Sequence, residues 1–319
     1  MSTTNQLRAM SARDERQVLQ GIGQTPLFEL EEFEVGRGAR VFAKLESVNP
    51  GGSIKDRPVA RMLLAARSAG ELAGRRRVLD SSSGNAGIAY AMLGARLGIP
   101  VTLVVPGNAS RERLDRIRSH GAELVLTDPI EGYDHAVREA QRLAQEQPER
   151  YYYCDQYSNP ENWRAHYQGT GEELLAQIVE RTGRPPDAFV AGIGTGGTIT
   201  GVGKRLREAD PEAWIAAVIP DPFPGIEGLK PLGRPGDLVP AILDQSLVQE
   251  RIPVSLEQAA ALTRQLAARG FYVGPSSGAA LHGALVLARR EPGWTVATIF
   301  ADTGERYGTT GLWTGPGAR

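Results

Sequence analysis

The chain has 319 residues, with 36 Lys and Arg against 37 Asp and Glu, and a formal net charge of −1. This balance gives no global field that would attract nucleic acid or an acidic membrane surface, so neither is expected as a partner. The single cysteine, Cys154, excludes a disulfide framework and a cysteine-rich metal site, and it fits a reducing compartment.

The length, at roughly 150 residues per domain, suggests two domains or one large α/β unit. No apolar run approaches the roughly 20 residues of a membrane span. Residues 1–20 are polar and carry no apolar signal region, so they are expected to form a helical or loosely ordered arm. These features predict a cytoplasmic protein.

Short apolar runs alternate with amphipathic stretches along most of the chain. Strands are expected at residues 41–46, 77–79, 101–105, 123–126, 188–191, 214–219 and 295–300, and helices at 54–68, 85–97, 110–120, 133–145, 171–180, 198–208, 256–269 and 278–290. Strands that alternate with helices of this length predict βαβ units and parallel sheets, and hence an α/β fold. Residues 220–253 contain seven prolines and are expected to be a long irregular segment with a functional role.

The first candidate site residue is Lys55, which follows the turn Asn49-Pro50-Gly51-Gly52-Ser53 at the start of a helix. A helix N-terminus disfavours a positive charge by a few tenths of a kcal/mol. An ordinary surface lysine is one interpretation. The other is that the amine is used, because covalent attachment to an aldehyde removes its charge.

Two serine-rich loops also lead into helices. Residues 80–87 (Asp-Ser-Ser-Ser-Gly-Asn-Ala-Gly) combine three hydroxyls, an amide side chain and the free amides of a helix start, which favour an anion. In residues 273–280, Ser276 could face a neutral heterocyclic nitrogen. An ordinary serine N-cap remains the alternative for both loops.

A glycine-rich loop follows the strand at 188–191 and reads Gly192-Ile193-Gly194-Thr195-Gly196-Gly197-Thr198. Small residues before a helix allow backbone amides to approach a phosphate. The loop also matches G-x-G-x-x-G, with Asp221 after the next strand. A nicotinamide-dependent dehydrogenase is therefore the remote alternative.

Taken together in this order and spacing, the four loops resemble the fold type II pyridoxal-phosphate enzymes, which have the tryptophan synthase β subunit-like fold. The chain is most similar to the cysteine synthase (O-acetylserine sulfhydrylase) family, with cystathionine β-synthase as a relative. The resemblance runs from residues 22–27 to residues 302–307, and the segments 49–57 and 82–85 are its most specific parts.

The resemblance implies two α/β domains with parallel-rich twisted sheets, a mobile one at 48–155 and a larger one at 1–47 plus 156–319. It implies a homodimer and the cofactor pyridoxal 5'-phosphate, held covalently by the catalytic Lys55. The cofactor phosphate would bind at Gly194, Thr195, Gly196, Gly197 and Thr198, the ring hydroxyl at Asn85 and the pyridine nitrogen at Ser276. The substrate carboxylate would bind at Ser82, Ser83, Gly84, Asn85, Ala86 and Gln156.

The reaction implied is β-replacement on an O-activated L-serine, a small-molecule substrate, with sulfide or another sulfur donor to give L-cysteine. Lys55 would remove and return the Cα proton. A cystathionine β-synthase-like or amine-nucleophile enzyme is the alternative. Residues 220–230 contain no arginine for a leaving phosphate, and Arg234 and Arg113 are the other candidates for that role. This favours O-acetylserine and leaves O-phosphoserine as the alternative.

The remaining histidines and the cysteine are not assigned to the chemistry. His120, His135, His166 and His282 have no metal-ligand spacing, so no metal is expected, and each is interpreted as structural or exposed. Cys154 is interpreted as a small buried hydrophobic residue rather than a nucleophile or redox switch.

Overall fold

The computed structural model describes residues 19–233, 237 and 239–314, so the expected arm at 1–20 lies outside it except for two residues. The chain forms two compact units. Unit 1 contains residues 59–156 together with the described residues 19–22, and unit 2 contains residues 23–58 and the described residues from 157 onward. The division predicted from the sequence, at 48–155, stays a prediction.

Unit 2 is built on a six-stranded sheet in the order β1-β2-β10-β7-β8-β9. The strands are β1 Leu27–Glu29, β2 Arg40–Leu45, β7 Ala188–Gly192, β8 Trp214–Pro220, β9 Glu250–Val254 and β10 Thr295–Phe300. Only β1 is antiparallel to its neighbour, and every other pair is parallel. The carboxyl ends of β2, β10, β7, β8 and β9 therefore lie along one edge of the sheet, where α/β proteins bind ligands.

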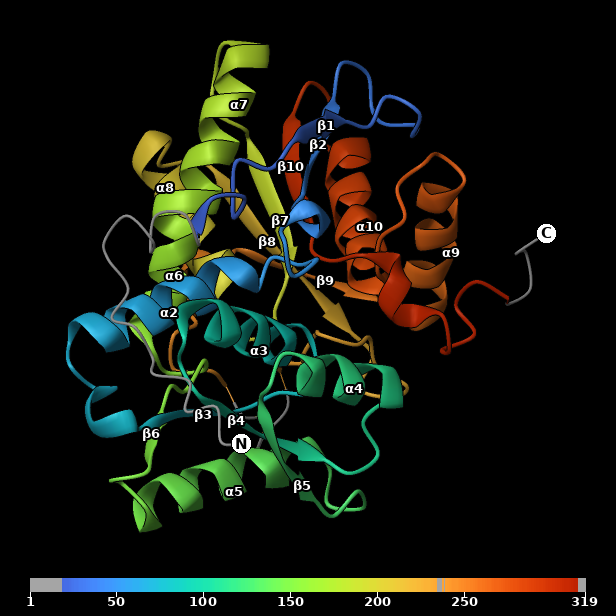
Figure 1. The fold of residues 1–319 in the computed structure, drawn as a ribbon. Coiled ribbons are helices and arrows are strands. Elements are labelled where there is room, and N and C mark those ends of the chain that lie inside the picture. Colours follow the sequence, from blue (N-terminus) through green and yellow to red (C-terminus); the bar gives the residue numbers. More distant parts are fainter. Residues whose placement is uncertain (1–18, 234–236, 238, 315–319) are drawn as a thin grey trace. The chain divides into compact units, whose positions relative to one another are not determined.

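Helices cover both faces of this sheet (Figure 1). They are α6 Pro160–Ala165, the π-helix η3 His166–Gly171, α7 Glu172–Thr182, α8 Gly197–Ala209, α9 Leu256–Ala267 and α10 Pro275–Arg290, with short 3-10 turns at η1 Glu46–Val48, η4 Gln245–Leu247 and η5 Gly304–Tyr307. Alternate residues of one strand enter different cores. In β7, Phe189 and Ala191 pack with α7 and α8, whereas Ala188 and Val190 pack with α9 and α10. This explains why buried parallel strands are continuously apolar.

Unit 1 contains an all-parallel four-stranded sheet in the order β5-β4-β3-β6. Its elements are α2 Asp56–Ser68 (which begins in unit 2), η2 Ala73–Arg75, β3 Arg77–Ser81, α3 Asn85–Leu97, β4 Val101–Pro106, α4 Arg111–Ser119, β5 Glu123–Thr127, α5 Gly132–Glu146 and β6 Tyr151–Tyr153. Helices α2, α3 and α4 pack on one face, and α5 packs on the other (Figure 1).

The predicted α/β class with parallel sheets is confirmed, but one expectation about local structure is wrong. The segment 220–253 is not irregular throughout, because it leads into β9, which pairs with β8. Pro253 is tolerated there because β9 is an edge strand, where a missing amide donor costs no ladder bond. The short elements β6 and α6 were not predicted.

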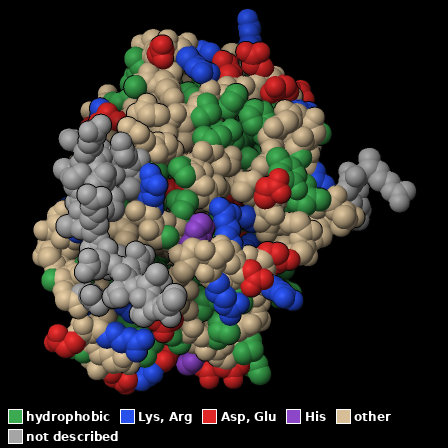
Figure 2. All heavy atoms as spheres, viewed as in Figure 1, with side chains coloured by type: hydrophobic (Ala, Val, Ile, Leu, Met, Phe, Trp, Pro, Cys, Tyr) green, Lys and Arg blue, Asp and Glu red, His purple; other side chains and the backbone are tan. Residues whose placement is uncertain are grey.

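The molecular surface carries both signs of charge. Figure 2 shows basic and acidic side chains interspersed across the visible face, in keeping with the balanced composition. In the part of the chain that the structure describes, no helix has both the length and the apolar character needed to cross a membrane. No cluster of three or more potential metal-ligating side chains occurs there either.

Candidate active site

Lys55 lies in the turn that leads into α2, beside the carboxyl end of β10. The backbone amide of Ile54 donates to the carbonyl of Ala301, the residue after β10, at 2.8 Å. The amide of Lys55 itself donates to the hydroxyl of Ser53 at 3.2 Å. These bonds fix the lysine backbone at the ligand-binding edge of the sheet.

The surroundings of Lys55 differ from those of the other lysines. The chain has four, all among the described residues. Lys44 and Lys204 form ion pairs of 2.9 and 2.6 Å with carboxylates, and Lys230 lies 5.0 Å from the centre of an aromatic ring. Among described residues, Lys55 has no such partner for its amine. The structure therefore singles out one lysine as available for chemistry.

The protonation of Lys55 is shifted toward the neutral form. Its side chain is half-buried. Burial lowers the pKa of the Lys55 amine, the carboxylate of Asp302 opposes this shift, and the guanidinium of Arg306 reinforces it. Only a neutral amine can act as a nucleophile or accept a proton, so this environment favours both roles.

The segment that carries Lys55 is anchored by a buried ionic network in unit 2. Arg57 donates to Glu46 at 2.7 Å and to both carboxylate oxygens of Glu173 at 2.7 Å, and Lys44 pairs with the same Glu173 at 2.9 Å. Burial by itself would raise the pKa of Glu173, but the hydrogen bond and charge of Arg57, with those of Lys44, lower it to about 2. The network thus holds charged groups in a protein interior that would otherwise disfavour them.

The glycine-rich loop joins β7 to α8 and is closely surrounded. Gly196 has a φ of +83° and precedes the helix. A Cβ at Gly197 would lie 2.1 Å from Asn162 Oδ1, and one at Gly194 would lie 2.6 Å from the carbonyl of Gly228. Asn162 in turn donates to the hydroxyl of Thr195 at 3.2 Å. Only glycine fits these two positions, and the free amides of the helix start can bind a phosphate.

His166 contacts this loop, which the sequence did not indicate. It opens the π-helix η3, is fully buried, and places Nδ1 at 3.0 Å from the Thr170 hydroxyl and Nε2 at 3.5 Å from the Thr198 hydroxyl. Burial, followed by the charges of Lys55 and Arg57, holds its pKa well below the usual range. The imidazole is therefore neutral, and His166 is a buried neighbour of the loop rather than an exposed residue.

The two serines at the start of α10 have different roles. Gly274 is the N-cap residue, so the alternative of a serine N-cap is wrong here. The hydroxyl of Ser277 is buried and accepts a hydrogen bond from the amide of Ala301 at 3.1 Å. Ser276 is half-buried, and its hydroxyl has no partner among the residues that the structure describes. Ser276 is thus the serine that remains available to a ligand.

In unit 1, the serine-rich loop joins β3 to α3. Gly84 is the N-cap residue and no side chain caps the helix, so the serine N-cap is wrong here as well. Ser82 is buried and accepts from the amide of Gly84 at 3.3 Å. The hydroxyl of Ser83 has no partner among described residues, and Asn85 is half-buried while Ala86 is buried. One loop hydroxyl is therefore structural and another is available.

Gln156 lies beside this loop. Its side-chain amide donates to the carbonyl of Ser81 at 3.1 Å, and its backbone amide donates to Asp80 at 3.2 Å. The structure thus brings together two segments that are far apart in the sequence and that were both predicted to bind the substrate carboxylate. Within unit 2 it likewise places Lys55, the glycine-rich loop and Ser276 at the same sheet edge, because β10 and β7 are neighbours.

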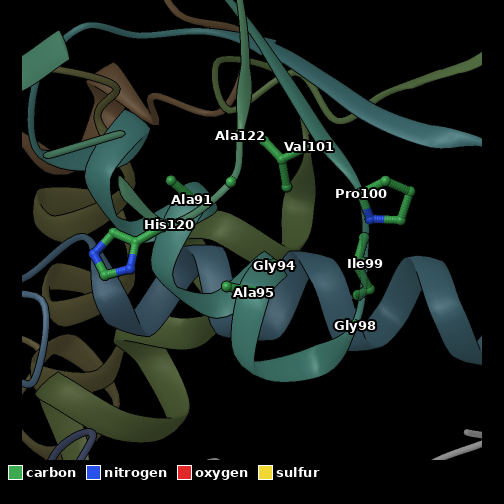
Figure 3. Close-up of a pocket in the computed structure, with 10 residues that line it drawn as sticks. Ala91, Gly94, Ala95, Gly98, Ile99, Pro100, Val101, His120 and Ala122 are labelled. Carbon is green, nitrogen blue, oxygen red and sulfur yellow. The ribbon is translucent and has the colours of Figure 1, made fainter. Parts of the chain in front are cut away.

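A separate hollow in unit 1 contains none of the predicted site residues. It is lined by small and apolar side chains of α3 and the following turn, such as Ala91, Ala95 and Ile99, with His120 at its side (Figure 3). Burial lowers the pKa of His120, which is the one titratable residue of the lining. The hollow therefore lacks the chemical groups of an active site.

Comparison with known proteins identifies the class. Residues 18–302 match the family described as pyridoxal-phosphate dependent enzyme. The cysteine synthase of Aquifex aeolicus is 44% identical over 92% of this chain and 91% of its own length, and the probable cysteine synthase of Bacillus subtilis is 40% identical over 92% and 96%. These values show that the chain belongs to the pyridoxal-phosphate dependent enzymes, with pyridoxal 5'-phosphate as its cofactor.

The same relatives and the solved structures show to which group of enzymes within this family the chain is most similar. The cysteine synthase (OASS) of Entamoeba histolytica is 32% identical with a TM-score of 0.85 over 98% of this chain and 93% of its own. An O-ureido-L-serine synthase is 35% identical with a TM-score of 0.85 over 94% and 95%. Within the family, the chain groups with the cysteine synthases, as the resemblance predicted.

The described residues of unit 2 fit this cofactor. Pyridoxal phosphate presents an aldehyde, a phosphate and a pyridine nitrogen, and unit 2 offers an unpaired amine, a loop of close-packed glycines and an unpaired hydroxyl at one sheet edge. The loop at Gly194–Gly197 leaves the backbone amides at the start of α8 free of Cβ atoms, and such amides are the groups that bind a phosphate.

Proposed function

We propose that this protein is a cysteine synthase that replaces the β-substituent of an O-activated L-serine with sulfide to give L-cysteine, with O-acetylserine preferred. The observation that carries the proposal is the environment of Lys55. Among described residues it is the one lysine with neither an ionic nor an aromatic partner, and burial lowers the pKa of its amine. The cysteine synthase relatives support the assignment of the reaction.

The proposed role of Lys55 has two parts. Its amine holds the cofactor covalently, and after the substrate displaces it, the freed amine removes the substrate Cα proton and later returns it. When bound, pyridoxal phosphate supplies the electron withdrawal that makes this proton acidic. The lowered pKa of Lys55 favours the neutral amine that removes the Cα proton, and the ammonium formed in that step is the group that later returns it.

The other cofactor contacts are proposed residue by residue. In unit 2, the residues from Gly194 to Thr198 bind the phosphate and Ser276 faces the pyridine nitrogen. Asn85, the first residue of α3 in unit 1, is proposed to bind the ring hydroxyl. A serine does not hold a proton on that nitrogen as a carboxylate would, so the ring withdraws electrons less strongly. This setting suits elimination of a good β-leaving group better than transamination.

Substrate recognition is proposed for unit 1. The loop of Ser82, Ser83, Gly84, Asn85 and Ala86 binds the substrate carboxylate through backbone amides and the Ser83 hydroxyl, which has no partner among described residues, with help from Gln156. Ala86 adds no hydroxyl of its own. The role of the loop is supported by its position at a helix start, which favours an anion.

The preference for O-acetylserine rests on the segment that follows β8. Residues 220–230 contain no arginine, and their one basic residue, Lys230, is engaged with the ring of Tyr157 at 5.0 Å. A leaving phosphate calls for a guanidinium or a free ammonium group. An acetyl group makes no such demand.

The assembly and location are also proposals. We infer a homodimer in the cytoplasm, since the family resemblance implies a dimer and the balanced charge and single cysteine fit a reducing compartment. Light scattering coupled to size-exclusion chromatography tests the dimer directly.

A kinetic comparison tests the proposed function. Purified protein loaded with pyridoxal phosphate is assayed for L-cysteine with sulfide and either O-acetyl-L-serine or O-phospho-L-serine, and Lys55→Ala serves as control. We expect a higher kcat/KM with O-acetyl-L-serine and no turnover by the control. A higher kcat/KM with O-phospho-L-serine would reverse the substrate assignment.

The same assay separates the competing nucleophiles. One solved neighbour is an O-acetylserine dependent cystathionine β-synthase from Helicobacter pylori, 32% identical with a TM-score of 0.81. Homocysteine is therefore tested beside sulfide. Efficient cystathionine formation with poor cysteine formation would replace the proposed reaction by that of this neighbour.

A further inference from the structure

A buried carboxylate lies at the end of the strand that leads into the serine-rich loop of unit 1. Asp80 sits near the end of β3, two residues before Ser82, and is fully buried. Its Oδ1 accepts from the amide of Ser81 at 2.7 Å, and its Oδ2 accepts from the Tyr90 hydroxyl at 2.6 Å and from the amide of Gln156 at 3.2 Å. None of the cofactor or substrate contacts proposed above involves Asp80.

These bonds connect two parts of the proposed substrate site. The backbone amide of Gln156 donates to Asp80, and its side-chain amide donates to the carbonyl of Ser81. Both the backbone and the side chain of Gln156 are therefore hydrogen-bonded to the end of β3. The hydroxyl of Tyr133 also donates to that carbonyl. One carboxylate therefore holds the strand that leads into the loop and the chain segment that carries Gln156.

We propose that Asp80 is a positioning residue for substrate binding: its ionised carboxylate holds Gln156 and the start of the 82–86 loop in the arrangement that receives the substrate carboxylate. This inference rests on the proposed function, because it takes the loop and Gln156 as the substrate site. Asp80 acts through these groups and does not contact the substrate itself.

The charge of Asp80 changes near neutral pH, which makes the idea testable. Burial, opposed by the bonds from Tyr90, Ser81 and Gln156 and assisted by the nearby Asp155, raises the pKa of Asp80 to about 7. The titratable groups that face it are Tyr90 from α3 and Asp155 after β6, and Cys154 lies against Tyr90. A protonated carboxyl is a weaker acceptor, so its hold on Gln156 weakens as pH falls through 7.

The central variant is Asp80→Asn, which keeps the shape and removes the charge. We expect its KM for O-acetyl-L-serine at pH 8.5 to exceed that of the unmodified protein by about tenfold, the value of one charge-assisted hydrogen bond. We expect kcat to change little. Since the unmodified protein loses its own Asp80 charge at low pH, the ratio of the two KM values should fall toward 1 at pH 6, and taking the ratio cancels titration of the substrate.

Tyr90→Phe provides a second variant in case Asp80→Asn does not fold. Loss of the Tyr90 hydroxyl removes a bond that lowers the pKa of Asp80. The pH at which substrate affinity improves should therefore move upward. The backbone amide resonance of selectively labelled Gln156 gives a readout independent of activity: it should titrate near pH 7 in the unmodified protein, at higher pH in Tyr90→Phe, and not at all in Asp80→Asn.

The outcomes separate this inference from the proposed site. Ser83→Ala is the matched loop variant and should raise KM for O-acetyl-L-serine at every pH. If Ser83→Ala does so but the Asp80→Asn ratio is independent of pH, or falls below 1 at high pH, the role of Asp80 is overturned while the substrate site stands. If neither variant changes KM, the substrate site is wrong and the inference falls with it.

Discussion

Replacing Glu173 by glutamine removes one buried charge from the network that anchors the Lys55 segment and keeps the side-chain shape. Glu173 is 13% exposed and pairs with Arg57 and Lys44 at 2.7 and 2.9 Å. In the variant, Arg57 keeps its bond to Glu46, but Lys44 loses its ionic partner. Breaking one side of a buried ion pair leaves uncompensated charge in the interior, which is strongly destabilising.

The size of the loss follows from the pKa of Glu173, which falls from 4.5 to about 2 on folding. Such a difference corresponds to about 3 kcal/mol of stability. Because the folded-state pKa is the lower one, this stability is fully present above pH 4.5 and is lost as pH falls toward 2. The variant has no carboxylate, so the gap between the two proteins should be about 3 kcal/mol at pH 7 and should shrink below pH 4.5.

Urea unfolding followed by tryptophan fluorescence measures this gap. All four tryptophans lie in unit 2, as does the network, so the signal reports the relevant unit. Glu172→Gln is the matched control. Glu172 is next to Glu173 in the sequence, but its carboxylate is 49% exposed and pairs with Arg205 at the surface. It should cost less than about 1 kcal/mol. Equal losses for the two variants, or a Glu173→Gln loss that does not change between pH 7 and pH 4, would refute the reasoning.

Two further predictions concern the glycine-rich loop and the cysteine. Gly197→Ala should weaken pyridoxal phosphate binding by roughly tenfold or more, since its Cβ would lie 2.1 Å from Asn162 Oδ1. Equilibrium dialysis checks this, with the uncrowded Gly308→Ala as control, and unchanged affinity would contradict the assigned loop. Cys154 is 2% exposed, so a thiol reagent should label the native chain only as slowly as it opens and should label one thiol per chain in denaturant. Rapid labelling of native protein would show that the thiol is accessible.

Long periodic elements could be predicted from the sequence because their signal is local. The helix Asn85–Leu97 and the strand Thr295–Phe300 have the bounds expected from their apolar spacing. The three-residue strand β6 is too short to show a period, and it exists because β3 lies beside it. In β9, the charged residues Glu250, which is half-buried, and Arg251, which is exposed, hide the apolar pattern of the strand, and pairing with β8 stabilises it.

The same division applies to the site. Lys55 and the glycine-rich loop stand out in the sequence because each carries its signal in a few consecutive residues. His166 and the Glu173 network do not stand out, because their partners lie far away along the chain. The partner of His166 is Thr198, and that of Glu173 is Lys44. The difference between Ser276 and Ser277 likewise depends on one hydrogen bond from Ala301, which residue type alone cannot reveal.

The central claim is that Lys55 is the lysine that binds the cofactor, and peptide mapping tests it most directly. Borohydride reduction of the holoenzyme converts a lysine–cofactor linkage into a bond that survives digestion. Mass spectrometry of the digest should then find one pyridoxyl group per chain, on the peptide that contains Lys55. A label on Lys44, Lys204 or Lys230, or none on any lysine, would contradict the account.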